Sequence, residues 1–131
     1  MQIIQKAAIK KDNTFLILLR SPEAKYFPEH WDFPGGKLGA NEDQITGIQR
    51  EVFEETGLKL RDLKVAGVYE LDLDKARHIT HRFTVYKGSA VNGAVRISSE
   101  HSAFRWATKE AILRLPIEPY IRLFFVEQLP L

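Results

Sequence analysis

The chain has 131 residues, of which 44% are hydrophobic and 27% charged, as in an ordinary soluble globular protein. This length predicts a single domain over residues 1–131 that buries roughly two thirds of its unfolded surface. The lack of cysteine excludes disulfides and thiolate metal sites, and a net charge of +2 gives no reason to expect a nucleic-acid polymer as partner. No signal peptide, membrane-spanning run or lipidation motif is found, so we expect no membrane partner and a cytoplasmic location.

The first elements expected are two strands, over residues 2–9 and 14–19, because both stretches are rich in apolar side chains. The turn residues at 11–13 indicate that the strands form a hairpin. A loop over residues 21–30 follows, and a loop of this length is often functional. Arg20, where the second strand ends, is therefore a candidate contact to a phosphate or a base. The alternative is an exposed charge at the end of a strand.

Residues 31–37, with the sequence WDFPGGK, lead into the longest predicted helix. The adjacent Gly35 and Gly36 permit backbone conformations that other residues avoid, and they let a ligand or metal approach the main chain. Trp31 and Phe33 are core candidates, and either is also a candidate for the wall of a base pocket.

A helix is expected from about Glu42 to Thr56. Asn41 is the predicted N-cap, with Gln44 in a capping-box arrangement. Gly57 suits the position that follows the last helical turn, where a left-handed conformation is common.

Two faces of this helix carry different chemistry. Three aliphatic side chains share the face expected to contact the core: Ile45, Ile48 and Val52. Three carboxylates share the neighbouring face: Glu51, Glu54 and Glu55. A solvated acidic helix is one interpretation. The other is a site for a hard divalent cation, which prefers oxygen ligands and often bridges carboxylates and phosphates. Arg50 can pair with Glu54 one turn later, and Gly47 leaves the acidic side open to a close neighbour.

The second half of the chain begins with two expected strands, over residues 65–73 and 79–86, with Gly67 marking a bulge. His78 and His81 are three residues apart, so a strand would not direct both to one face. We therefore interpret them as residues of the strand surface rather than as a pair of metal ligands.

The remaining elements are a loop at 98–101, a strand at 104–107, a short helix at 108–115 capped by Thr108, and a helix at 119–128. The last helix has an apolar face that is expected to join the core, formed by Ile121, Phe124 and Phe125.

The stretch from Gly36 to Leu58, GKLGANEDQITGIQREVFEETGL, resembles the Nudix box at every specified position. The matching residues are Gly36, Glu42, Arg50, Glu51, Val52, Glu54, Glu55, Gly57 and Leu58. On these residues the chain is identified as a member of the Nudix family of pyrophosphate-cleaving hydrolases. The shorter stretches at 77–80 and 115–119 are similar to the MutT branch, the sanitising triphosphatases.

The resemblance implies an α/β fold, the Nudix α/β/α sandwich, in which a mixed β-sheet lies between helices. It also implies a catalytic Mg²⁺ or Mn²⁺ ion. The implied ligands are the carboxylates of the box helix and the Gly35 carbonyl, with Glu100 as a further ligand: Gly35, Glu51, Glu54, Glu55 and Glu100. Glu51 or Glu100 would orient or deprotonate the attacking water, while Arg50 would brace the catalytic helix.

The substrate that the resemblance favours is a nucleoside triphosphate, cleaved to the monophosphate and pyrophosphate. Arg20 and Lys37 are candidate phosphate contacts, and Phe33 and Ile117 are candidate base contacts. Ile117 is a departure, because the MutT branch can carry an asparagine there that reads the purine edge. ADP-ribose or a nucleotide sugar is the alternative substrate, and a catalytically silent nucleotide-binding module is the alternative function. The chain is expected to be a monomer or a homodimer.

Overall fold

The computed structural model describes residues 1–127, so the expected end of the last helix at residue 128 lies outside the described residues. Within this range the strands are β1 (Gln2–Lys11), β2 (Thr14–Arg20), β3 (Trp31–Asp32), β4 (Gly35–Lys37), β5 (Leu60–Asp74), β6 (Ile79–Ala90) and β7 (His101–Ala107). The helices are α1 (Gln44–Thr56), α2 (Lys109–Ile112) and α3 (Pro119–Glu127). No helix among these residues has the length and apolar character needed to cross a membrane.

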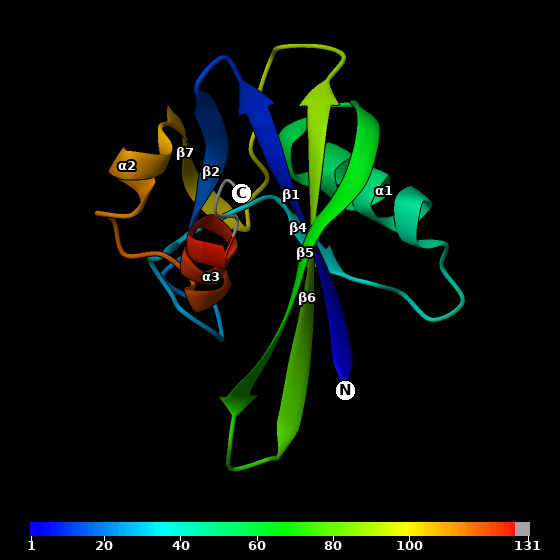
Figure 1. The fold of residues 1–131 in the computed structure, drawn as a ribbon, viewed down its shortest axis with the longest axis vertical. Coiled ribbons are helices and arrows are strands. Elements are labelled where there is room, and N and C mark those ends of the chain that lie inside the picture. The colour runs from blue at the N-terminus through cyan, green and yellow to red at the C-terminus, as the bar shows by residue number, and fades with distance from the viewer. Residues whose placement is uncertain (128–131) are drawn as a thin grey trace.

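The strands form one mixed sheet with the order β3-β2-β1-β6-β5, in which β4 also pairs with β1 and β7 with β2. The central pair, β1 and β6, is parallel from Gln2 opposite His81 to Ile9 opposite Gly88. The predicted β1–β2 hairpin is confirmed, with Lys11 opposite Thr14. Figure 1 shows α1 and α3 on opposite sides of this sheet. The α/β class and the sandwich of a mixed sheet between helices are thus confirmed.

Alternation along β1 divides the core into two layers. Ala7 and Ile9 pack with Ile48 and Val52 of α1, whereas Ala8 between them packs with the residues that surround α3. Successive side chains of a strand point to opposite faces, so the run of apolar residues in β1 serves both layers. A strand buried on both faces fixes the positions of α1 and α3 relative to each other.

Helix α1 begins later than the sequence indicated. Asp43, not Asn41, is the N-cap, because its carboxylate accepts a hydrogen bond from the Thr46 backbone N–H at 3.0 Å. Asn41 instead adopts a left-handed conformation with φ of 62° in the preceding loop. The expected end is confirmed, since Gly57 has φ of 74° and donates its N–H to the Phe53 carbonyl. Ile45 was wrongly placed on the core face and is 41% exposed.

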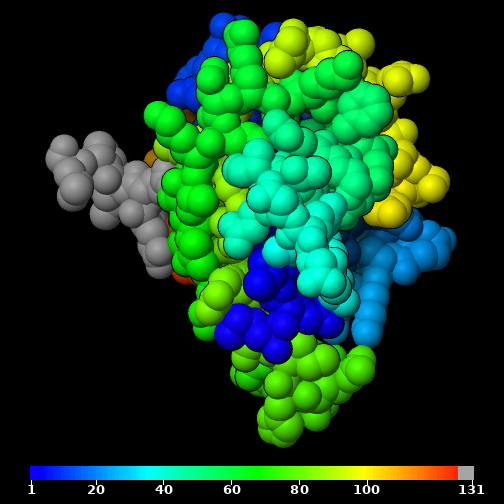
Figure 2. Space-filling view, turned by 90° about the vertical axis from the view of Figure 1, so that its right-hand side faces the viewer, coloured from blue at the N-terminus to red at the C-terminus, as the bar shows by residue number. Residues whose placement is uncertain are grey.

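The β5–β6 hairpin is longer than predicted and extends beyond the rest of the molecule, as Figure 1 shows. The predicted bulge is confirmed, because the register of β5 against β6 shifts between Val65 and Gly67. The segment that precedes α1 and the loop after β2 lie on one side of the molecule, near the N-terminal end of β1 (Figure 2).

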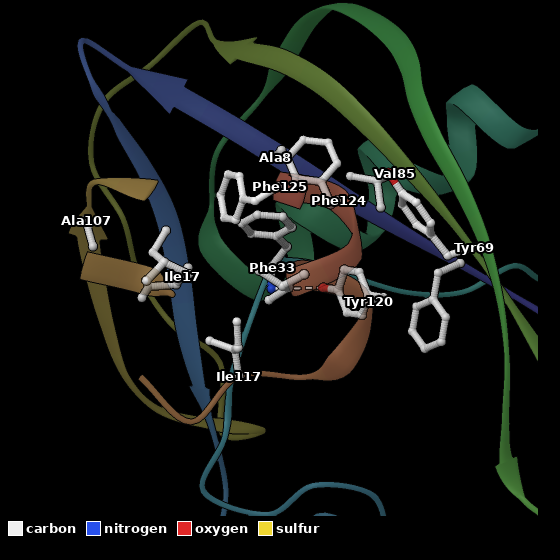
Figure 3. Packing of buried hydrophobic residues seen from close by; sticks show 13 residues of the cluster. Ala8, Ile17, Phe33, Tyr69, Val85, Ala107, Ile117, Tyr120, Phe124 and Phe125 are labelled. Atoms are coloured by element: carbon white, nitrogen blue, oxygen red, sulfur yellow. Dashed lines mark hydrogen bonds between the residues drawn. The ribbon is translucent and has the colours of Figure 1, made fainter. Parts of the chain in front are cut away.

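The C-terminal elements close the second core layer. Thr108 caps α2 by accepting from the Ala111 N–H, although α2 ends at Ile112, before the expected position. Helix α3 begins at Pro119 as predicted, and Ile121, Phe124 and Phe125 are buried. The two phenylalanines surround Phe33, whose backbone N–H donates to the Tyr120 hydroxyl (Figure 3).

Candidate active site

A cavity of about 520 Å³ opens between α1, the loop after β2 and the β5–β6 hairpin. Most of the site residues expected from the sequence contribute to its wall: Arg20, Gly35, Lys37, Glu51, Glu55 and Glu100. The whole wall is supplied by six strands, by helix α1 and by three connecting segments, so only the tertiary fold brings these residues together. Acidic and basic side chains therefore face the same space.

The glycine pair brings the acids of α1 against the backbone of β4. Gly35 has φ of 145°, and a Cβ atom there would overlap the backbone carbonyl of Gln5 on β1. Its N–H donates a hydrogen bond of 2.8 Å to Glu55 Oε1. A Cβ atom on Gly36 would lie 2.5 Å from Glu51 Oε2. Glycine at position 35 thus lets β4 approach the backbone of β1, and glycine at position 36 lets the Glu51 carboxylate approach the main chain.

Arg50 connects the acids of the box to one another. The predicted pair with Glu54 is confirmed at 3.1 Å, and the guanidinium also contacts Glu42 at 2.7 Å and Glu51 at 3.1 Å. The hydrogen bond from Arg50 lowers the pKa of Glu42 to about 2. The same side of the helix explains Gly47, where a Cβ atom would lie 2.9 Å from Gln5 Oε1 and 3.1 Å from the Glu42 carboxyl group.

The three carboxylates of α1 differ in their environments. Glu54 is exposed, Glu51 is partly buried, and Glu55 is only 6% exposed. Burial raises the pKa of Glu55 to about 8, against the opposing effects of the Lys6 ammonium and the Gly35 N–H. Burial likewise raises the pKa of Glu51, and the charges of Glu54 and Glu100 act in the same direction. These carboxylates are therefore costly to ionise together without a cation.

The donor set fits a hard divalent cation, because carboxylates that raise one another's pKa are stabilised in their charged form by such an ion. Among residues 1–127, however, no three His, Asp or Glu side chains already form a metal site. Glu51 and Glu54 are instead turned to Arg50, and Glu55 is turned to the Gly35 N–H. Arg50 contacts only Oε1 of Glu51, so the second carboxylate oxygen of Glu51, which lies beside Gly36, is not engaged by the guanidinium.

A network of buried charges that sequence reasoning missed lies behind the cavity. Asp32 is fully buried and contacts Lys6 at 2.7 Å and Arg20 at 3.0 Å, while the Tyr120 hydroxyl also donates to it. Arg20 further contacts Glu118 at 3.3 Å. Burial opposes the ionisation of Asp32, yet the two cations hold the pKa of its carboxyl well below the usual range. The available signals were a lysine within an apolar strand and an aspartate between Trp31 and Phe33.

The alternative interpretation of Arg20, as an exposed charge at a strand end, is therefore wrong. Its side chain is 23% exposed, is paired with two carboxylates and lines the cavity. His81 was also misjudged as a surface residue, since it is buried and lines the same cavity. His78 is exposed in the turn that precedes β6.

Two expected base contacts do not reach the cavity. Phe33 is fully buried among Tyr120, Phe124 and Phe125, as Figure 3 shows. Ile117 is buried in the same core cluster, and its backbone forms a bridge with Trp31. Their apolar side chains complete the core under α3, so their positions give no support to a contact with the substrate. Glu54 and Arg50 are not part of the cavity wall described above, although Arg50 contacts Glu51 in that wall.

Residues 7–127 match the family profile described as NUDIX domain, and the chain therefore belongs to the NUDIX family. It is 32% identical over 112 residues to a "MutT-like protein" of Streptomyces ambofaciens, covering 86% of this chain and 66% of that relative. It is 32% identical over 109 residues to the "Putative 8-oxo-dGTP diphosphatase 2" of Mycobacterium tuberculosis, covering 82% of this chain and 73% of that relative. The alignments thus span about two thirds to three quarters of these relatives' lengths.

The fold is similar to the solved structure of a MutT NUDIX hydrolase from Burkholderia pseudomallei, with a TM-score of 0.86, 25% identity and 98% of each chain covered. The family resemblance and the enzyme class expected from the sequence, a Nudix-type pyrophosphohydrolase, are confirmed. Nudix hydrolases act on nucleoside diphosphate derivatives and generally need a divalent metal ion.

Proposed function

We propose that this chain hydrolyses a nucleoside triphosphate to the monophosphate and pyrophosphate, with Mg²⁺ or Mn²⁺ as the cofactor. The observation that carries the proposal is one cavity whose wall combines Glu51, Glu55 and Glu100 with the cations Lys37 and Arg20. Hydrolysis of a triphosphate needs acids that hold a divalent ion and cations that contact the phosphates, because the phosphates must be held in place while their charge is neutralised. The name of the Mycobacterium relative points to the same substrate class.

The acids of α1 and the glycine pair would hold the ion through Glu51, Glu54, Glu55 and the Gly35 carbonyl, with Glu100 as a further ligand. When bound, a divalent ion neutralises phosphoryl oxygens and lowers the pKa of a coordinated water. Glu51 or Glu100 would orient or deprotonate the water that attacks phosphorus. Both residues line the cavity, so both remain candidates for this role.

The other polar residues would position these groups. Arg50 holds Glu42, Glu51 and Glu54 on one side of α1 and so keeps the acids close together. Lys37 is exposed at the end of β4, so its long side chain can adjust its position to contact a phosphate. Arg20 is held by Asp32 and Glu118, and its role in phosphate binding would be that of a fixed charge.

The test is a panel of dGTP, 8-oxo-dGTP, dCTP and ADP-ribose, with release of pyrophosphate or phosphate measured in Mg²⁺ and in excess EDTA. We expect cleavage of nucleoside triphosphates only with metal. Glu54→Gln should lower kcat by at least about a hundredfold, the scale of losing one preorganised electrostatic contact. Its circular dichroism should be unchanged, because Glu54 is exposed.

Glu110→Gln is the matched control, since Glu110 is exposed on α2 and takes no part in the cavity wall described above. Full activity in EDTA or in Glu54→Gln would overturn the metal mechanism. A preference for ADP-ribose over every triphosphate would overturn the substrate class and leave the metal mechanism standing.

A further inference from the structure

The wall of the cavity carries a buried histidine that the proposed mechanism does not use. His81 lies on β6, only 2% of its surface is exposed, and its side chain still lines the cavity. Its ring nitrogen Nδ1 is buried and has no hydrogen-bond partner among the described residues. Leaving a buried polar group without a partner is unfavourable, so a ligand that satisfies the imidazole would be bound more tightly.

The wall beside His81 suits a flat, apolar group. Phe83 is two residues further along β6, so both side chains share one face of the sheet, and Ile4 lies directly opposite Phe83 on β1. Ile4, Phe83 and Leu73 of β5 all line the cavity. The ring of Phe83 is held in place by stacking on Tyr120 at 4.6 Å. This part of the wall therefore combines a rigid apolar surface with one polar group.

Tyr26 contacts the imidazole and fixes its orientation. The two rings meet edge to face with 5.5 Å between centroids. The Tyr26 hydroxyl donates to Asp74 Oδ2 at 3.2 Å, and its backbone carbonyl accepts from Arg20 Nε at 3.0 Å. Tyr26 thus connects the loop after β2 to the β5–β6 hairpin at His81.

We propose that His81 hydrogen-bonds the polar edge of the substrate's base and that Tyr26 is the residue that positions its ring. This rests on the proposed nucleotide substrate. The base would lie against Ile4, Leu73 and Phe83, and the phosphates would extend toward the acids of α1. A second buried histidine in the cavity wall, His101, also has an Nδ1 with no partner within residues 1–127. It directly follows Glu100 and so belongs to the acidic end.

Binding to the wild-type protein tests the inference without catalysis. The ring nitrogens of ¹⁵N-labelled protein are followed by NMR while dGMP, dCMP or inorganic pyrophosphate is added in EDTA. We expect a monophosphate to shift the His81 ring nitrogens and pyrophosphate to leave them unchanged. The exposed His78, three residues earlier, is the internal control and should not move.

Two substitutions separate binding from chemistry. His81→Leu should raise KM for the preferred triphosphate by about tenfold or more, the scale of one lost hydrogen bond, with kcat within about twofold of the wild type. His81→Gln restores a donor and an acceptor, so part of the affinity should return. Tyr26→Phe removes only the bond to Asp74 and should raise KM less, again with kcat retained. His78→Leu should match the wild type.

A monophosphate that shifts backbone amides of the cavity but leaves the His81 ring unchanged would overturn the inference and leave the proposed function intact. A KM of His81→Leu equal to that of the wild type would also overturn the inference and leave the proposed function intact. A protein that binds no nucleotide either in EDTA or with Mg²⁺ would overturn both proposals. If His81→Leu does not fold, the NMR titration of the wild type still shows whether the base contacts His81.

Discussion

Glu55 is a buried carboxyl group whose ionisation should destabilise the metal-free protein. Burial raises its pKa to about 8 from an ordinary value of 4.5. Between these two values the folded protein holds a proton that the unfolded chain releases. The free energy of unfolding therefore falls as pH rises through this interval and becomes level above it.

The size of the effect follows from the shift. One pKa unit corresponds to about 1.4 kcal/mol, so the wild type should lose roughly 3 to 4 kcal/mol between about pH 5 and pH 8 from this group. Glu55→Gln has nearly the same volume, keeps an oxygen that can accept from the Gly35 N–H, and does not titrate. Any cost of burying the amide is the same at both pH values, so it cancels from the comparison.

The assay is urea unfolding followed by tryptophan fluorescence, in EDTA, at both pH values. Relative to the wild type, Glu55→Gln should gain roughly 3 kcal/mol of stability on going from about pH 5 to pH 8. Glu110→Gln, an exposed change on α2, should follow the wild type at both. If the difference in free energy of unfolding between Glu55→Gln and the wild type is the same at both pH values, the reasoning is refuted.

Two further predictions concern the buried charges and the metal. Asp32→Asn leaves the Lys6 ammonium buried without its counterion and should lower the free energy of unfolding by about 3 to 5 kcal/mol, whereas the exposed Asp72→Asn should change it little. An unchanged urea midpoint in Asp32→Asn would contradict this. Because burial raises the pKa of Glu55 to about 8, binding of Mg²⁺ or Mn²⁺ should release a proton near neutral pH and weaken as pH falls from about 8 to 6. Calorimetry in two buffers of different ionisation enthalpy measures this release, and metal affinity that is equal at both pH values would contradict it.

Features that depend on neighbours along the chain were predictable from the sequence. The end of α1 at Gly57, the Arg50–Glu54 pair and the start of α3 at Pro119 each depend on residues within about one helical turn. The Nudix box is equally local, and with it came the family and the fold class. The N-cap of α1 was missed because Asn41 and Asp43 are both good caps, and only the path of the loop decides between them.

The buried charges behind the cavity, and the burial of His81 in its wall, were decided by the tertiary structure alone. Asp32 is 26 residues from Lys6 and 88 from Tyr120 along the chain, so no local pattern links these residues. The same holds for His81. The sequence indicates a residue of the strand surface, but in the fold β1 pairs with β6 beside it and Tyr26 of the loop after β2 packs on its ring. Their positions in motifs made Ile117 and Phe33 candidate base contacts, but both side chains pack in the core beneath α3. Burial depends on which strands and helices become neighbours, and that is settled by packing across the whole domain rather than by spacing along the sequence.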